Sequence, residues 1–200
     1  MKVVAFNGSA RKDGNTAVMI KRVLSVLESK GFDTELVQLA GEQIQGCNAC
    51  RTCHKTKNSR CVIESDNVNA YIQKMIEADG VILGSPVYFS MMTPEMKALI
   101  DRAGYVARAN SNLFKRKVGA AVVVARRAGG IPTFDALNNF FLINQMIIPG
   151  SCYWNVGFGN AKGDVEKDEE GMKTMEDLGK NMAFLLNRLK TKSRKPALKK

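Results

Sequence analysis

Apolar residues form five short runs along the chain, and glycine, proline or polar residues bound each run. Residues 2–7, KVVAFN, and 117–125, KVGAAVVVA, are rich in β-branched and small apolar side chains. Runs that are apolar throughout are typical of strands in a sheet covered on both faces. The strands that we predict span residues 2–7, 34–39, 80–85 and 117–125, with a less regular fifth at 146–156.

Amphipathic segments separate these runs. In residues 15–30 the apolar side chains share one helical face, and Gly31 ends the segment. The other predicted helices cover 67–78, the stretch from Pro94 to Ala103, 132–145, and a C-terminal helix with an apolar stripe from Met175 to Leu189. Alternating strands and helices imply parallel pairing with right-handed crossovers. We therefore predict one doubly wound α/β domain over residues 1–189, with a five-stranded parallel sheet.

The loop after the first strand, NGSARKDGNT (7–16), has the composition of a phosphate-binding turn. It offers hydroxyl groups, one cation and a glycine at a predicted helix start, where the helix dipole favours an anion. The candidate ligands are Ser9, Arg11, Gly14, Asn15 and Thr16. The lysine of a P-loop is absent, which favours a monophosphate over a triphosphate. A polar turn that only caps the helix is the alternative.

The loop after the third strand, within GSPVYFSMMTPEMKALIDRAG (84–104), is apolar where a ligand would lie. It carries Pro86, Val87, Tyr88 and Phe89, followed by two methionines. Large flat or deformable side chains at the ligand edge of a sheet would suit a planar aromatic ring. Packing between helices or subunits is the alternative. A phosphate at one end and a flat ring at the other describe FMN.

Composition and charge narrow the class of protein. No apolar run reaches the ~18 residues of a membrane span, and the N-terminal one is too short for a signal peptide. We therefore expect a cytoplasmic protein with reduced thiols. The net charge is +11, and residues 190–200 form a basic tail with six positive charges and no acid. No aromatic residue is interleaved with them, so nucleic-acid binding is not expected.

Four of the five cysteines lie in one segment of sixteen residues, GCNACRTCHKTKNSRC (46–61). The spacing of Cys47, Cys50, Cys53 and Cys61 is close to ferredoxin-type spacing, in which one loop wraps a cubane. A [4Fe–4S] cluster is the favoured interpretation. Free or redox-active thiols and a zinc site are the alternatives, and zinc fits less well because structural zinc sites use two separated knuckles.

Structural roles are expected for three further residues: His54, Cys152 and Trp154. His54 is expected to be a surface residue and not a fifth ligand. Cys152, in the predicted fifth strand, is expected to be a buried core thiol, and Trp154 to lie in the core or an interface. With one histidine beside the cysteines, no Ser-His-Asp or Cys-His-Asn arrangement is feasible.

Three motifs carry a resemblance to a known family. GSARKDGNT, GSPVYFSMMTPEMKALIDR and GNAKGDVEKDEEGMKTMEDLGKNM occur in the order and spacing of the NADPH-dependent FMN reductase-like branch of the flavodoxin-like fold. With its cysteine segment, the chain resembles an iron–sulfur flavoprotein. The resemblance implies a flavodoxin-like doubly wound sandwich in which the first loop holds the FMN phosphate and residues 86–89 line the flavin. It also implies that backbone N–H groups of Gly129 and Gly130 approach the ring's polar edge.

The resemblance implies an electron-transfer function. FMN would exchange two electrons, and a [4Fe–4S] cluster would pass them singly to or from a carrier such as ferredoxin or to a small acceptor. The alternative is a cluster-free reductase that takes hydride from NAD(P)H, and a third hypothesis is a redox sensor without enzymatic activity. Members of the family form homodimers or homotetramers, so the same is expected of this chain.

Overall fold

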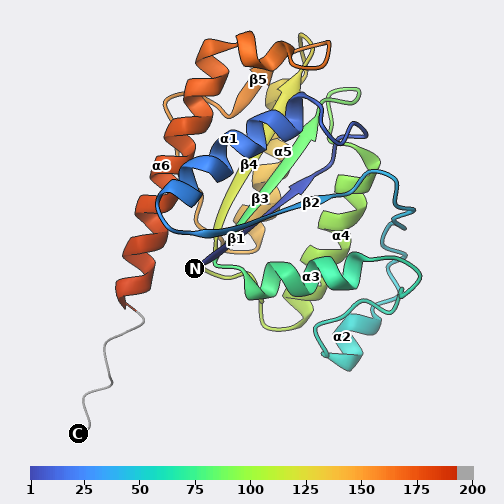
Figure 1. Ribbon diagram of the computed structural model, residues 1–200. Coiled ribbons are helices and arrows are strands. Elements are labelled where there is room, and N and C mark those ends of the chain that lie inside the picture. Colours follow the sequence, from blue (N-terminus) through green and yellow to red (C-terminus); the bar gives the residue numbers. More distant parts are fainter. Residues whose placement is uncertain (193–200) are drawn as a thin grey trace, which may run out of the picture.

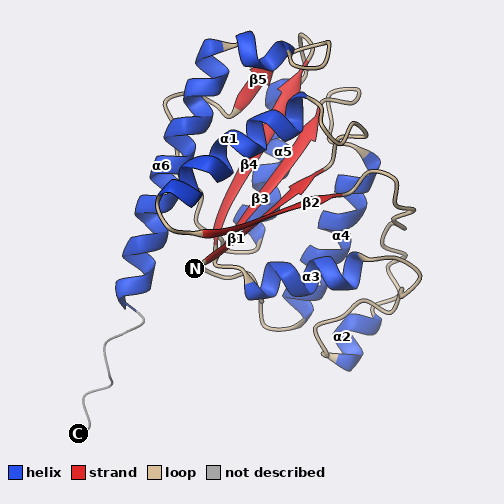
Figure 2. Cartoon of the chain, viewed as in Figure 1, coloured by secondary structure: helices blue, strands red, loops and turns tan. Residues whose placement is uncertain are grey.

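The computed structural model of the protein describes residues 1–192, with side chains to residue 189. Five parallel strands form one sheet in the order β2-β1-β3-β4-β5 (Figures 1 and 2). They are β1 (Lys2–Asn7), β2 (Asp33–Gln38), β3 (Gly80–Pro86), β4 (Val118–Ala125) and β5 (Val156–Phe158). This order is the flavodoxin-like one, with its switch point between β1 and β3. The predicted fold class is confirmed.

Helices cover both faces of the sheet (Figure 2). One apolar core lies under α1 (Asn15–Ser29) and α6 (Glu169–Lys192). The other lies under α3 (Val68–Glu77), α4 (Pro94–Ala109) and α5 (Gly130–Ile143). The two remaining elements are α2 (Thr52–Thr56), within the cysteine segment, and the 3-10 helix η1 (Asp164–Lys167). No helix in the described part of the chain has the length and apolarity to cross a membrane.

The interior strands match their sequence prediction because they are buried on both faces. All eight residues of β4 are buried, and the two strands that flank the switch point are nearly as enclosed. The basic tail predicted for residues 190–200 lies outside the part whose side chains are described, although α6 continues to Lys192.

The predicted fifth strand is wrong over most of its length. Only residues 156–158 pair with β4, and residues 146–155 contribute a single bridge, from Ile147 to Val118. Pro149 lacks the N–H that a ladder requires. Cys152 and Trp154 are therefore exposed, at 54% for the tryptophan, so neither is a core residue.

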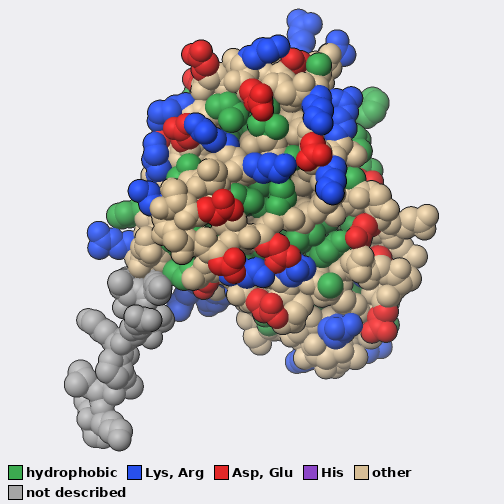
Figure 3. Space-filling view, in the orientation of Figure 1, with side chains coloured by type: hydrophobic (Ala, Val, Ile, Leu, Met, Phe, Trp, Pro, Cys, Tyr) green, Lys and Arg blue, Asp and Glu red, His purple; other side chains and the backbone are tan. Residues whose placement is uncertain are grey.

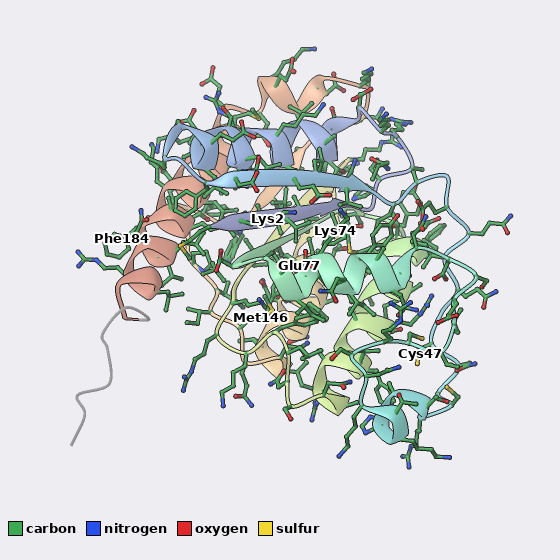
Figure 4. All side chains as sticks on the ribbon, turned by 60° about the horizontal axis from the view of Figure 1, so that its bottom comes forward. Lys2, Cys47, Lys74, Glu77, Met146 and Phe184 are labelled. Carbon is green, nitrogen blue, oxygen red and sulfur yellow. The ribbon has the colours of Figure 1, made fainter. Side chains whose placement is uncertain are left out.

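The edge strand β2 is tied to its neighbours by one carboxylate. Glu35 is paired with Lys2 of β1, at 2.8 Å between Nζ and Oε2, and with Lys74 of α3; Figure 4 labels both lysines. Hydrogen bonds from Lys2 and Lys74 outweigh partial burial and hold the pKa of Glu35 below its ordinary value of 4.5. This network joins the sheet to α3, the helix that follows the cysteine segment.

Glu35→Gln is expected to lower the free energy of unfolding by less than about 1 kcal/mol near neutral pH, since the pair is partly exposed. The unfolded chain binds the proton more tightly, so the stabilisation is present above pH 4.5 and is lost as the pH falls through the lowered pKa. Urea unfolding of both proteins across this range measures it. A stability difference that stays constant with pH contradicts the assignment.

Candidate functional site

The loop after β1 is held against β3 and the start of α4. The N–H of Gly8 donates to the carbonyl of Gly84 at 2.8 Å, and Thr93 Oγ1 donates to the carbonyl of Gly8 at 2.8 Å. A Cβ atom on Gly8 would lie 3.0 Å from Thr93 Oγ1 and 3.2 Å from the Gly84 carbonyl. Glycine therefore allows the loop to sit at the switch point, where this class of sheet binds ligands.

A cleft opens at this point, and we call it the switch-point cleft. Seven of the predicted flavin-site residues line it: Ser9, Arg11, Asn15, Thr16, Pro86, Val87 and Tyr88. Four lining residues were not predicted as ligands: Val124, Arg126, Gly159 and Asn160. The structure thus brings the loops after β1, β3, β4 and β5 together in one cleft.

One end of the cleft is formed by the N-terminus of α1. Gly14 is the N-cap residue and supplies no side-chain hydrogen bond, and the first turn contains no acid. Ser9 Oγ accepts from the N–H of Arg11 at 3.1 Å, which curls the loop over the helix start. The free N–H groups of a helix start, with the hydroxyls of Ser9 and Thr16, form an electropositive end that fits a phosphate.

Asn15, which lines the cleft, also fixes the loop that follows β5. Its Nδ2 donates to the carbonyl of Ala161 at 2.8 Å, and its Oδ1 accepts from the N–H of Gly163 at 2.8 Å. The side-chain amide thus holds the loop after β5 against the helix start. Arg11 reaches the same loop through the carbonyl of Asn160, at 3.3 Å.

Gly159→Ala tests this junction, because an added Cβ would lie 2.6 Å from Asn15 Nδ2 and 2.9 Å from the backbone nitrogen of Val165. We expect the variant to lose about 1–3 kcal/mol of stability through overpacking and to bind flavin more weakly. Gly150→Ala is the matched control, since a Cβ there meets nothing within 4 Å. Denaturant unfolding and flavin titration measure both effects; equal behaviour of the two variants contradicts the role given to Asn15.

The other end of the cleft is apolar. Pro86 and Val87 are half-buried, and Tyr88 is 45% exposed, facing the cleft from a tight turn that it closes with Met91. Phe89 is fully exposed at the tip of that turn, with a positive φ of 50°, and does not line the cleft. Three of the four residues predicted at this end are therefore in place around it.

The loop after β4 approaches from the other side. Gly129 has a φ of +81°, and a Cβ on it would lie 2.9 Å from Val87 Cγ1. Gly129 therefore supports the apolar loop, while it and Gly130 line a neighbouring pocket with Arg127. Arg126 is the cation of this loop that faces the switch-point cleft.

The cysteine segment, residues 46–61, lies at the opposite end of α4 from this cleft, and α2 packs beside the helix there (Figure 1). Cys53 is buried, Cys61 half-buried, and Cys47 and Cys50 are exposed. Figure 4 labels Cys47 on this loop. All four line one small cavity, together with Arg102, Tyr105 and Val106 of α4.

The thiols of this cavity are free and differ in acidity. All five cysteines of the chain are unpaired. Hydrogen bonds from Thr52 lower the pKa of the Cys50 thiol, whereas burial raises the pKa of Cys53. Among the described residues, no group of three or more His, Cys, Asp or Glu side chains is arranged to hold a single metal ion. His54 is exposed and stacks edge-on against Tyr105, at 4.8 Å between ring centroids.

Comparison with known proteins agrees with these features. Residues 1–161 match the family described as NADPH-dependent FMN reductase. The fold is shared with a flavodoxin from the Archaea, at a TM-score of 0.60 and 15% identity over 94% of this chain and 99% of that one. The chain therefore belongs to the NADPH-dependent FMN reductase family, and it is a flavin-dependent oxidoreductase.

Its relatives place the chain more narrowly. It is 37% identical to an iron–sulfur flavoprotein of Methanocaldococcus jannaschii, over 95% of this chain and all of the relative. It is 34% identical to the iron–sulfur flavoprotein of Methanosarcina thermophila, over 93% of this chain and 95% of the relative. Within its family, the chain thus belongs with the iron–sulfur flavoproteins by sequence.

Proposed function

We propose that the switch-point cleft binds FMN and that Cys47, Cys50, Cys53 and Cys61 hold a [4Fe–4S] cluster. The observation that carries the proposal is the presence of two separate donor sets on one chain. A helix start with hydroxyls and an apolar wall suits a flavin phosphate and ring, and four free thiols around one cavity suit a cluster.

The cysteine cavity offers the four thiols that a cluster requires, but it is smaller than a cluster. It holds only about 20 Å³, so the exposed loop must move outward to admit four irons and four sulfides. A cubane spreads its thiolates over four irons, which agrees with the lack of a close three-ligand site among the described residues. Lys55, Lys57 and Arg60 are exposed around the loop and would offset part of the negative charge.

When bound, the two cofactors supply two-electron and one-electron redox chemistry. The chain's own residues position them: the loops after β1 and β5 hold the phosphate end, and Val87 and Tyr88 shield the ring. We propose a small electron carrier such as ferredoxin as the partner, with a small molecule as an alternative acceptor. Basic side chains, spread among acidic ones on the face in Figure 3, and a net charge of +11 favour brief docking of an acidic carrier.

A second candidate function is a cluster-free NAD(P)H-dependent FMN or quinone reductase. The small volume of the cysteine cavity favours it. A relative from Bacillus subtilis with 26% identity is described as a putative NAD(P)H-dependent FMN-containing oxidoreductase. In this case the cysteines would act as free thiols.

The two functions differ in iron content. Protein purified without oxygen should contain FMN, with about four irons and four sulfides per chain. Flavin without iron would leave the reductase as the function, and protein that binds no added FMN would remove both. Single-turnover reduction by ferredoxin and by NADPH then separates them. Fast reduction by NADPH and none by ferredoxin would contradict the carrier role.

We also propose a homodimer or homotetramer. Exposed apolar side chains support it: Ile131, Tyr153, Trp154 and Phe158 line one pocket, and Leu142 and Ile143 lie at the C-terminal end of α5. A second copy of the chain would remove them from water. Light scattering behind size exclusion measures the mass, and a monomer at micromolar concentration would contradict the proposal.

A further inference from the structure

Among the residues that the structure describes, Arg102 of α4 is the largest fully buried side chain, with 1% exposure, and it forms an ion pair with Asp66. Both terminal nitrogens of the guanidinium donate hydrogen bonds. Nη1 donates to Asp66 and to the carbonyl of Gln45 at 3.2 Å, and Nη2 donates to the carbonyl of Ile63 at 2.9 Å. A buried cation is costly unless each donor is paired, so its placement requires an explanation.

The hydrogen-bond partners of Arg102 give one reason for its burial: they lie on both sides of the cysteine segment. Gln45 immediately precedes the cysteine segment, and Ile63 follows it by two residues. Asp66 also accepts from the N–H of Gln45, at 3.0 Å. The buried ion pair therefore ties both ends of the cysteine segment to one point on α4, and the loop projects from that point.

The third nitrogen of the guanidinium, Nε, makes none of these contacts. Arg102 Nε is buried and has no hydrogen-bond partner among the described residues. Arg102 lines the cavity that the four cysteines surround, and Cys61 lines the same cavity two residues before Ile63, the residue whose carbonyl Arg102 binds. An unpaired buried N–H costs about 1–3 kcal/mol, and a thiolate or sulfide sulfur in this cavity would satisfy it.

We propose that Arg102 is a positioning residue for the cluster, donating its Nε–H to the Cys61 sulfur and raising the cluster's reduction potential. The inference rests on the proposed cluster. Reduction adds one electron, from the flavin or a ferredoxin-type carrier, to a site that is already negative. A fixed cation beside that site stabilises the reduced form more than the oxidised form.

Arg102 differs from the other cations near the loop in its burial. Lys55, Lys57 and Arg60 are exposed, so water and salt screen them. Arg102 and its partner are enclosed, with side-chain exposures of 0% and 2%. The guanidinium lies on the cavity side of the pair, so its charge acts on the cavity more strongly than that of Asp66.

Redox titration of the anaerobic, cluster-loaded protein, followed by electron paramagnetic resonance, tests the inference. Arg102→Gln should lower the ratio of reduced to oxidised cluster at a fixed potential about tenfold, which is 59 mV for one electron. Asp66→Asn should shift the potential in the opposite direction, upward. A merely structural role would not move the two variants oppositely, and equal or same-direction shifts overturn the inference.

Arg108→Gln is the matched control, because it removes the same charge from an exposed position on the same helix. Its cluster potential should stay at the wild-type value, as should the flavin potential in all variants. If Arg102→Gln folds without its cluster, Asp66→Asn decides: a raised potential supports the inference and an unchanged or lowered one overturns it. Wild-type protein without iron would contradict the proposed function instead, so the two failures are distinguishable.

Discussion

Cys61→Ala is expected to lose most of its iron and sulfide and to keep FMN. The other three candidate ligands lie within seven residues, on or beside α2, whereas Cys61 closes the cavity from the far end of the loop. Asn69 of α3 fixes it there: its Oδ1 accepts from the N–H of Cys61 at 2.8 Å, and its Nδ2 donates to the Cys61 carbonyl at 2.9 Å. The long gap before Cys61 is thus bridged by contacts that do not require the metal.

Iron and sulfide analysis of anaerobically purified protein, with the visible spectrum, measures this outcome. Iron should fall from about four per chain to well below that, while the flavin bands remain, because the switch-point cleft is built from other loops. Cys152→Ala is the control: this thiol is exposed and lies outside the cysteine segment. Full iron in Cys61→Ala would show that the ligand set is wrong, and loss of FMN would show that the two sites depend on each other.

The strands illustrate which parts of the fold could be predicted from the sequence. β4 is apolar at nearly every position because both its faces are buried, and that pattern is local. β5 pairs over three residues only, and the approach to it is fixed by Asn155, whose Nδ2 donates to the carbonyl of Ala121 at 3.0 Å. A single long-range hydrogen bond leaves no periodic pattern, so the predicted strand began too early.

The candidate site likewise contains residues that the local sequence predicts and residues that only long-range contacts place there. Residues near Ser9 and Val87 were predictable because a strand, a polar or apolar loop and a helix follow one another in the sequence. Gly159 and Asn160 are held at the cleft by long-range hydrogen bonds, in which Asn15 and Arg11 take part. The sequence GNAKGD (159–164) carries no sign of these contacts. Arg102 looks like an ordinary helix charge until its partner, 36 residues earlier, is seen to be buried with it.

Arg11→Gln is expected to weaken FMN binding about tenfold to a hundredfold, since a charged hydrogen bond contributes about 1.5–3 kcal/mol. Arg11 is the cation of the loop that lines the electropositive end of the switch-point cleft. Its partner would be the flavin phosphate, so riboflavin, which lacks the phosphate, should bind to variant and wild type alike. Quenching of flavin fluorescence on titration of the apoprotein gives both dissociation constants.

Lys12→Gln supplies the matched control for this prediction. It removes the same charge from the neighbouring residue, which is exposed and does not line the cleft. If Lys12→Gln weakens FMN as much as Arg11→Gln does, the effect is the general field of a positive protein and not a phosphate contact. If Arg11→Gln weakens riboflavin equally, Arg11 acts through its hydrogen bond to the Asn160 carbonyl, and the phosphate end of the cleft must be assigned to the helix start alone. Selective loss of FMN binding places the phosphate beside Arg11.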